Sequence, residues 1–227
     1  MIFYEILVLL VALIVGYLFG SIPCGVIISK IFFHYDVRDF GSGNSGGTNA
    51  GRVMGKKFGL LVILLDMIKL LIPFLGTWLL MTKTSLINLS LLDMPEIVYY
   101  GCALSCLIGH CWPVYIGFNG GKAVSCTAAT IASTSLIAII GSFISFMTTL
   151  KLTKFVSLSS IIGSIVACLI SYLVFVPTIG DYIVYNGMSN SFVYPILMTC
   201  EMIILIIRHS SNIKRIKNGS ESKIKWL

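Results

Sequence analysis

Charged side chains are scarce in this sequence. Only 11% of its 227 residues are Asp, Glu, Lys or Arg, whereas 57% are hydrophobic. A typical soluble domain carries about 25% charged residues, so the composition excludes an ordinary soluble protein. Together with a mean hydropathy of +0.96, it predicts an integral membrane protein, and we expect residues 1–227 to form a single domain.

Acidic side chains are the scarcer of the two signs, with nine against sixteen Lys and Arg, which gives a formal net charge of +7. A basic balance can indicate a nucleic-acid partner. Here, however, the basic residues lie between apolar runs and at the C-terminus, a pattern typical of cytoplasmic loops beside anionic lipid. We therefore expect membrane lipids and no nucleic acid as partners, and no feature predicts the oligomeric state.

Disulfide and metal-site patterns are also lacking. The seven cysteines show no disulfide-framework spacing. Cys102, Cys106 and His110 share one helical face, but no fourth metal ligand is evident, so core packing is favoured and neither a metal nor an organic cofactor is expected. No Lys or Arg precedes the first apolar run and no small-residue cleavage signal follows it. That run is therefore predicted to be a retained span and not a signal peptide.

Six apolar runs can enter a bilayer, over residues 2–22, 58–80, 97–115, 127–146, 161–176 and 192–207. Six crossings would split the basic segments between both faces, against the positive-inside rule. If the Ser- and Thr-rich run 127–146 instead enters and returns, breaking near Gly141, five full spans remain. We therefore predict an all-α polytopic membrane bundle of five full spans plus a re-entrant pair of half-helices, seven helical segments, with the N-terminus outside and the C-terminus cytoplasmic.

Glycine is concentrated in one loop between the first two spans. Residues 41–52 read GSGNSGGTNAGR, with five glycines, several hydroxyl and amide side chains, and a final arginine. Glycines allow the backbone to approach a ligand closely, and successive N–H groups form a concave anion site. A flexible turn would need only one or two glycines, so the loop is predicted to bind phosphate. It is not a Walker A loop, because no Gly-Lys-Ser/Thr follows at the required spacing.

Three further polar segments are predicted to share the cytoplasmic face with this loop. They are the second glycine-rich loop with Gly120, Gly121 and Lys122, the VSLSS segment at 156–160, and the basic tail from Arg208. Together they offer cationic and neutral donors for one or two phosphate groups. Asp66 and Lys69, three residues apart inside the second span, are predicted to form a buried structural pair.

Two other functions are compatible with parts of the sequence. His34 and Asp39 match the His-x4-Asp motif of acyltransferases that use acyl-thioesters, with His as general base. The proline-glutamate-glycine block of those enzymes is absent. An anion transporter is the other alternative, since re-entrant segments and intramembrane ion pairs occur in transporters. Against it, the apolar runs show no two-fold repeat and the donors gather on one face.

The motifs taken together resemble the bacterial acyl-phosphate:glycerol-3-phosphate acyltransferases over nearly the whole chain. The similar blocks are GSIPCG at 20–25, DVRDFGSGNSGGTNAGR at 36–52, the Asp66/Lys69 pair, GHCWPVYIGFNGGKAV at 109–124, VSLSS, and RHSSNIKRIKNGSE at 208–221. The resemblance implies acyl transfer from an acyl phosphate to the 1-hydroxyl of sn-glycerol 3-phosphate, giving lysophosphatidate and inorganic phosphate at the bacterial cell membrane. This sequence departs from the family pattern at two positions. Gly47 stands where the family usually has alanine, and Ala123 stands where it usually has glycine, so that a methyl group there can oppose a positive φ.

We expect one group of residues to surround the phosphates and another to hold the second substrate. The phosphate group comprises Ser42, Gly43, Asn44, Thr48, Asn49, Arg52, Gly120, Gly121, Lys122, Ser157 and Ser160. The second comprises His209 and Asn212, supported by Arg208 and Glu221. Acyl phosphate is already activated, so positioning and charge neutralisation are the main requirements. Both His209 and the departing phosphate oxygens are candidates to take the hydroxyl proton.

Overall fold

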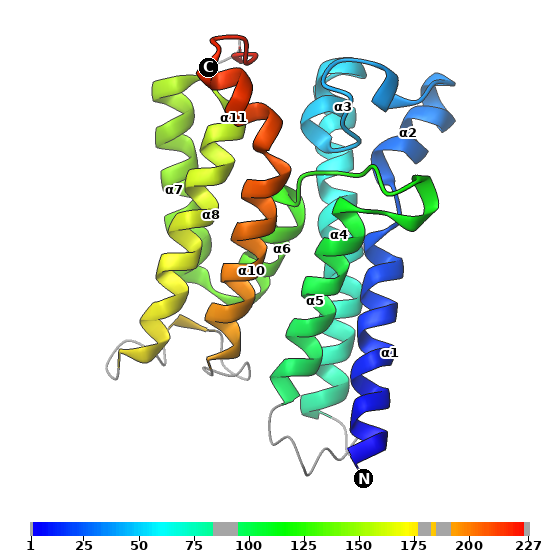
Figure 1. Ribbon diagram of the computed structural model, residues 1–227, viewed down its shortest axis with the longest axis vertical. Helices are drawn as coiled ribbons and strands as arrows, with labels where there is room; N and C mark the ends of the chain where they lie inside the picture. The colour runs from blue at the N-terminus through cyan, green and yellow to red at the C-terminus, as the bar shows by residue number, and fades with distance from the viewer. Residues whose placement is uncertain (1, 84–94, 177–182, 185–191, 225–227) are drawn as a thin grey trace. The chain divides into compact units, whose positions relative to one another are not determined.

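The structure, a computed structural model, describes residues 2–83, 95–176, 183–184 and 192–224. Within these ranges every regular element is helical (Figure 1), which confirms the predicted all-α class. The α-helices are α1 (Ile2–Gly20), α2 (Cys24–Phe33), α3 (Gly47–Val53), α4 (Lys56–Lys83), α5 (Pro95–Cys111), α6 (Val124–Thr134), α7 (Leu136–Thr153), α8 (Val156–Ser171), α10 (Val193–Arg208) and α11 (Ser210–Lys217). Short 3-10 turns are η1 (Val37–Asp39), η2 (Val114–Ile116) and η3 (Tyr172–Phe175).

Five described segments are long and apolar enough to cross a membrane. They are Phe3–Phe33, Lys56–Lys83, Pro95–Ile116, Leu136–Thr153 and Val156–Phe175, and α10 with α11 forms a further pair bent by 53°. This agrees with the predicted membrane bundle. The connections over 84–94 and most of 177–191 lie outside the described residues.

The break within the fourth apolar run differs from the prediction. It lies at Ser135, between α6 and α7, whereas Gly141 is inside α7. The hydroxyl oxygen of Ser135 accepts a hydrogen bond from the backbone N–H of Ala138 at 3.1 Å, so this serine caps the new helix. The chain reverses direction there (Figure 1). A capping hydroxyl, and not the helix-tolerated glycine, therefore fixes the position of the break.

The chain forms two compact units, residues 1–129 and 130–227. In the first unit α1, α4 and α5 pack against one another. Gly16 and Gly20 of α1 face α5 so closely that a Cβ on Gly20 would lie 1.9 Å from the carbonyl oxygen of Cys106. Two glycines four residues apart let membrane helices approach closely. Cys102 and Cys106 thus belong to a packed helix interface.

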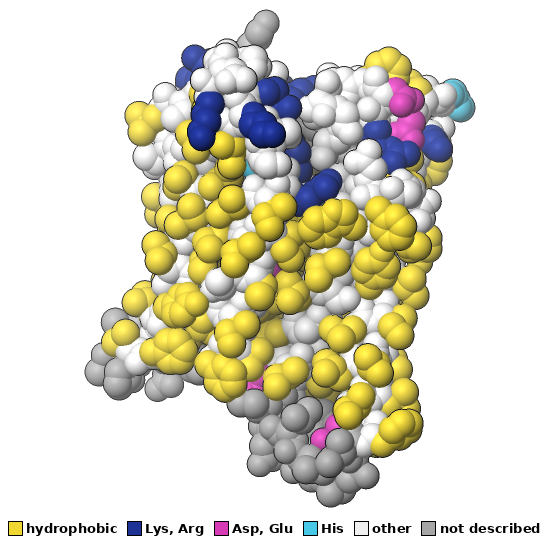
Figure 2. Space-filling view, in the orientation of Figure 1, with side chains coloured by type: hydrophobic (Ala, Val, Ile, Leu, Met, Phe, Trp, Pro, Cys, Tyr) yellow, Lys and Arg dark blue, Asp and Glu magenta, His cyan; other side chains and the backbone are white. Residues whose placement is uncertain are grey.

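In the second unit α7 and α8 form a hairpin, and α10 packs on α8. The C-terminal segment returns to the turn of this hairpin, where the Ile224 N–H donates to the Lys154 carbonyl at 3.0 Å. The basic end of α7 and the basic tail therefore share one end of this unit. Within each unit taken by itself, Figure 2 shows Lys and Arg side chains near one end of the helices and hydrophobic side chains over their flanks.

Candidate functional site

The first glycine-rich loop is organised around the buried amide of Asn49. Its Oδ1 accepts from the backbone N–H of Ser42 at 2.7 Å and from the Ser42 hydroxyl at 3.1 Å. Its Nδ2 donates to the carbonyls of Val37, Phe40 and Asn44 at 2.9–3.0 Å. These contacts occupy both donor and acceptor atoms of the amide. Asn49, predicted as a phosphate ligand, is therefore a scaffold of the loop.

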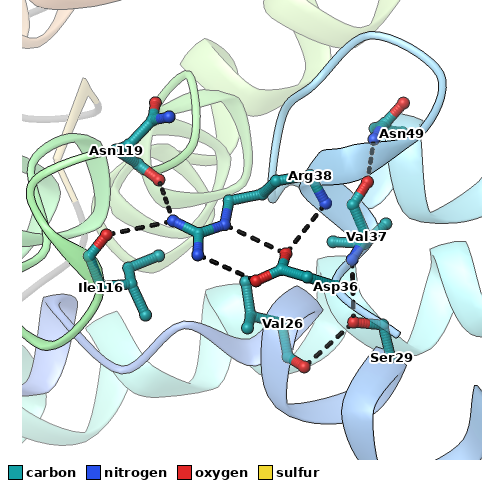
Figure 3. A network of polar contacts seen from close by, with 8 residues as sticks. All are labelled: Val26, Ser29, Asp36, Val37, Arg38, Asn49, Ile116 and Asn119. Atoms are coloured by element: carbon teal, nitrogen blue, oxygen red, sulfur yellow. Dashed lines mark hydrogen bonds and ion pairs between the residues drawn. The ribbon is translucent and has the colours of Figure 1, made fainter. Parts of the chain in front are cut away.

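The two glycine-rich loops are joined through Asn44 and Arg38. Asn44 Nδ2 donates to the Gly120 carbonyl at 3.2 Å, while its Oδ1 accepts from the Gly46 N–H at 2.9 Å. Arg38 Nη1 donates to the Ile116 carbonyl at 3.0 Å and contacts that of Asn119 at 3.5 Å (Figure 3). The predicted convergence of these two loops is thus present within the first unit. Neither Arg38 nor its partner Asp36 was among the predicted site residues.

Asp36 holds the Arg38 guanidinium in a two-pronged ion pair. Arg38 Nε donates to one carboxylate oxygen at 3.1 Å and Nη2 to the other at 2.9 Å. These hydrogen bonds lower the pKa of Asp36 below its usual value, despite the opposing effect of partial burial. The carboxylate is therefore charged at neutral pH, and it fixes the plane of the guanidinium.

The second loop lies against the imidazole of His110. The Gly121 N–H donates to the His110 carbonyl at 2.9 Å, and a Cβ on Gly121 would lie 1.9 Å from His110 Nε2. On its other side, His110 Nδ1 is 3.6 Å from Asp66 Oδ1. The ring therefore connects the loop before Lys122 to the interior of the helix bundle, a role that sequence spacing did not reveal.

The predicted buried pair of Asp66 and Lys69 is present. Lys69 Nζ lies 2.9 Å from Asp66 Oδ1 and donates to the Ile22 carbonyl at 2.7 Å. Ile22 lies in the break between α1 and α2, just before Pro23, and its carbonyl also accepts from the backbone N–H of Cys24 at 3.1 Å. The pair thus stabilises the interruption of the first span next to the glycine-rich loops.

Ala123, where the resemblance leads us to expect glycine, adopts a left-handed backbone. Its φ is +68° and the residue is fully buried. This conformation costs an alanine about 1 kcal/mol relative to glycine. The expected conflict between the methyl group and a positive φ is therefore confirmed, and the loop tolerates it.

The predicted ligands of the first loop that project outward are Ser42, Thr48 and Arg52, all of them exposed. Among the residues that the structure describes, no hydrogen bond or ion pair engages the side chains of Thr48 and Arg52. Lys122 in the second loop is half-buried. The first unit therefore offers an exposed guanidinium and an ordered backbone, the donor types that bind phosphate.

A second cluster lies within the second unit and centres on Glu221. Its Oε1 accepts from Ser157 Oγ at 2.7 Å and from Asn212 Nδ2 at 2.6 Å, and its Oε2 accepts from Arg215 Nε at 2.7 Å. Burial raises the pKa of Glu221, but the hydrogen bonds from Asn212, Ser157 and Arg215 outweigh it, so the pKa is lowered. Glu221 thus organises the tail, while Arg215 is a partner that sequence reasoning missed.

His209 lies at the junction of α10 and α11 and is buried. Its Nδ1 is 2.8 Å from the Leu205 carbonyl oxygen, which can only accept, so Nδ1 carries the hydrogen. In the neutral ring Nε2 is then the atom that can take a proton.

Two other predicted residues of this unit are Ser160 and Arg208. Ser160 donates its hydroxyl to the Val156 carbonyl of its own helix at 2.9 Å, and Arg208 is half-buried at the end of α10.

The His-x4-Asp motif is open to solvent in the structure. His34 and Asp39 are both exposed, and no hydrogen bond or ion pair joins them. No group of three or more His, Cys, Asp or Glu side chains is placed to hold a metal ion in these described ranges.

The family model described as glycerol-3-phosphate acyltransferase matches residues 10–219. A glycerol-3-phosphate acyltransferase of Listeria monocytogenes serotype 4a (strain HCC23) is 39% identical, over 94% of this chain and 96% of that protein. The chain belongs to the glycerol-3-phosphate acyltransferase family. It is therefore an acyltransferase. A glycerol-3-phosphate acyltransferase of Staphylococcus aureus (strain Newman) is likewise 39% identical, over 97% of this chain and 100% of that protein.

Solved structures of this family have the same fold. A crystal structure of PlsY, an integral membrane glycerol 3-phosphate acyltransferase in its glycerol 3-phosphate form, is 29% identical with a TM-score of 0.76, and the match covers 96% of both chains. The lysophosphatidic acid form of PlsY gives a TM-score of 0.74 at 28% identity, covering 96% of this chain and 95% of that one. Both are membrane proteins, in agreement with the apolar helices described above.

Proposed function

We propose that this acyltransferase moves the acyl group of an acyl phosphate to the 1-hydroxyl of sn-glycerol 3-phosphate. The products are lysophosphatidate and inorganic phosphate. The observation that carries the proposal is the junction of the two glycine-rich loops through Asn44 and Gly120. It joins the segment that bears Arg52 to the segment that bears Lys122. The PlsY forms named for glycerol 3-phosphate and lysophosphatidic acid support the same substrate and product.

The reaction needs positioning more than activation. The 1-hydroxyl oxygen attacks the acyl carbonyl carbon, the bond from that carbon to the phosphate oxygen breaks, and phosphate leaves with the bonding electrons. The hydroxyl proton passes to His209 Nε2 or to an oxygen of the departing phosphate. Cationic donors lower the activation barrier by stabilising the charge that grows on the departing phosphate. Holding the two anionic substrates in line for attack supplies the remaining rate enhancement.

The proposed roles divide the predicted residues between the two substrates. Arg52 and Lys122 neutralise phosphate charge, aided by Ser42, Thr48 and the backbone of Gly43, Gly120 and Gly121. In the second unit His209 and Asn212 contact glycerol 3-phosphate, while Glu221 and Arg208 hold that region in shape. Ser157 was predicted to face the phosphates, but its hydroxyl donates to Glu221, so we assign it to this support. Ser160 remains in the proposed phosphate group, although its hydroxyl donates within α8.

The donor is the first point to test. Purified protein should form lysophosphatidate from acyl phosphate and glycerol 3-phosphate, and acyl-coenzyme A alone should not support turnover. His34→Ala and Asp39→Ala should both keep substantial activity, because the two side chains form no dyad. Turnover with acyl-coenzyme A, lost in both variants, would overturn the acyl-phosphate proposal.

The phosphate contacts are the second point. A charge-assisted hydrogen bond is worth about 1.5–3 kcal/mol, so Arg52→Ala and Lys122→Ala should each lower kcat/KM by about ten- to a hundredfold. Arg52→Lys keeps the charge but loses the planar fork, and it should recover only part of the activity. Lys57→Ala is the matched control, since Lys57 is also basic and exposed beside the loop. Near wild-type kcat/KM in both alanine variants would contradict the phosphate role.

A further inference from the structure

Arg38 lies between the two glycine-rich loops, and the protein itself occupies its guanidinium. Asp36 accepts from Nε and Nη2, and the carbonyls of Ile116 and Asn119 face Nη1 (Figure 3). All three guanidinium nitrogens therefore have acceptors within the chain. Only 23% of the side chain is exposed. This distinguishes Arg38 from the exposed Arg52, whose guanidinium has no such acceptors among the described residues.

The segment that carries Arg38 is itself anchored to the helices. The N–H of Val37 donates to Ser29 Oγ at 3.1 Å, and that hydroxyl donates to the Val26 carbonyl at 3.0 Å. The Val37 carbonyl accepts from Asn49 Nδ2 at 3.0 Å. Hydrogen bonds thus anchor Val37, the neighbour of Arg38 in the 3-10 turn η1, to α2 and to the centre of the first loop.

The Arg38 side chain reaches the start of the second loop. Asn119 directly precedes Gly120, and Ile116 lies three residues before Asn119. Between them the backbone turns through positive φ at Gly117 and Phe118, at 69° and 60°. A left-handed backbone at a bulky residue is costly and persists only where contacts hold it. The Arg38 contacts flank these two residues on both sides, so they can hold this turn in its strained form.

We propose that Arg38 is a positioning residue for phosphate binding: clamped by Asp36, it fixes the 116–119 turn and thereby the place of Lys122. The proposal rests on the proposed function, because it assigns Lys122 a phosphate contact. Arg38 itself does not touch the substrate. Its planar fork bonds a carboxylate and the second loop at once, a task that one ammonium group does not perform.

A double-mutant cycle tests this proposal. Arg38→Gln, Lys122→Ala and the double variant are compared by kcat/KM for glycerol 3-phosphate at fixed acyl phosphate. A displacement of about 1 Å in a positioned group can cost about a hundredfold in rate, so Arg38→Gln alone should lower kcat/KM by about ten- to a hundredfold. In the Lys122→Ala background the same change should cost less than about threefold, since coupled residues are not additive. Lys30→Gln, a nearby exposed lysine, is the control.

Local hydrogen exchange separates positioning from general destabilisation. In Arg38→Gln the amides of residues 116–122 should exchange faster, while those inside α5 keep their wild-type rates. If Arg38→Gln does not fold, Asp36→Asn serves instead, because it weakens the clamp and leaves Arg38 in place. Equal losses in both backgrounds, or unchanged exchange at 116–122, would overturn the positioning role alone. A silent Lys122→Ala would overturn the phosphate role of Lys122 and this inference with it.

Discussion

Replacing Gly121 by alanine should displace the loop that carries Lys122. The added Cβ would lie 1.9, 2.5 and 2.8 Å from three atoms of the His110 ring, whereas ordinary contacts begin at 3.4 Å. The ring or the loop must therefore shift by about 1.5 Å, the difference between 3.4 and 1.9 Å. The ring has little room, because Asp66 lies on its other side. Overpacking of this kind costs about 1–3 kcal/mol.

The effect on catalysis should exceed the effect on stability. A shift of more than 1 Å next to a substrate-binding residue corresponds to about a hundredfold loss of kcat/KM. Initial rates of lysophosphatidate formation, with thermal unfolding in detergent measured in parallel, report the two effects separately. Gly76→Ala is the control, because nothing lies within 4 Å of a Cβ at that helical site. His110→Ala should relieve the clash, so the double variant should be more active than the two single losses predict.

Wild-type activity and stability in Gly121→Ala would refute the packing of His110 against the loop. A double variant in which the two losses of activity simply add would refute it as well, because the clash with His110 would then not be the cause of the loss in Gly121→Ala.

Three other measurements test the described geometry. Ala123→Gly removes an alanine from a left-handed backbone. The larger entropy of an unfolded glycine offsets part of this gain, so the variant should be stabilised by up to about 1 kcal/mol, with a higher unfolding temperature and activity retained. A lower unfolding temperature would contradict the positive φ at this position. Because the pKa of Glu221 is lowered by its partners, its stabilising effect should be complete above its ordinary pKa of 4.5 and disappear as pH falls below it. The gap in unfolding temperature between wild type and Glu221→Gln should therefore close in acid, and a gap that widens there would reject the network. The orientation of the chain in the membrane can be tested with single cysteines in a background without the native ones. Ser220→Cys should react with an impermeant thiol reagent only from the cytoplasm, and Thr82→Cys only from outside. The reverse labelling pattern would contradict the proposed orientation.

The span lengths were predictable from the sequence because they follow from composition alone. A bilayer requires about 20 apolar residues per helix, and Pro23 marks the end of α1. The break at Ser135 was misplaced because glycine was given more weight than a capping hydroxyl. In a membrane helix glycine is tolerated, while an N-cap supplies an acceptor that the helix start requires.

The interior of the candidate site was less predictable, because it depends on contacts between distant segments. The glycine-rich loop and Arg52 were recognisable from residue type and spacing. That Asn49 supports the loop backbone depends on the folded path of residues 37–44, which no local pattern specifies. The contact of His110 with Asp66 likewise depends on the packing of α5 against α4. Residue type indicated which groups suit phosphate, but only the fold separated scaffold residues from exposed donors.

The buried Asn49 amide has a thermodynamic consequence for substrate affinity. Ordering a flexible residue costs about 1–2 kcal/mol in conformational entropy. Because Asn49 bonds the backbone at Val37, Phe40, Ser42 and Asn44, this loop is ordered before any ligand arrives. Binding free energy is then available for selecting and holding the substrate. In Asn49→Asp, whose carboxylate lacks the three donations, the entropy of ordering would move from the folding step to the binding step.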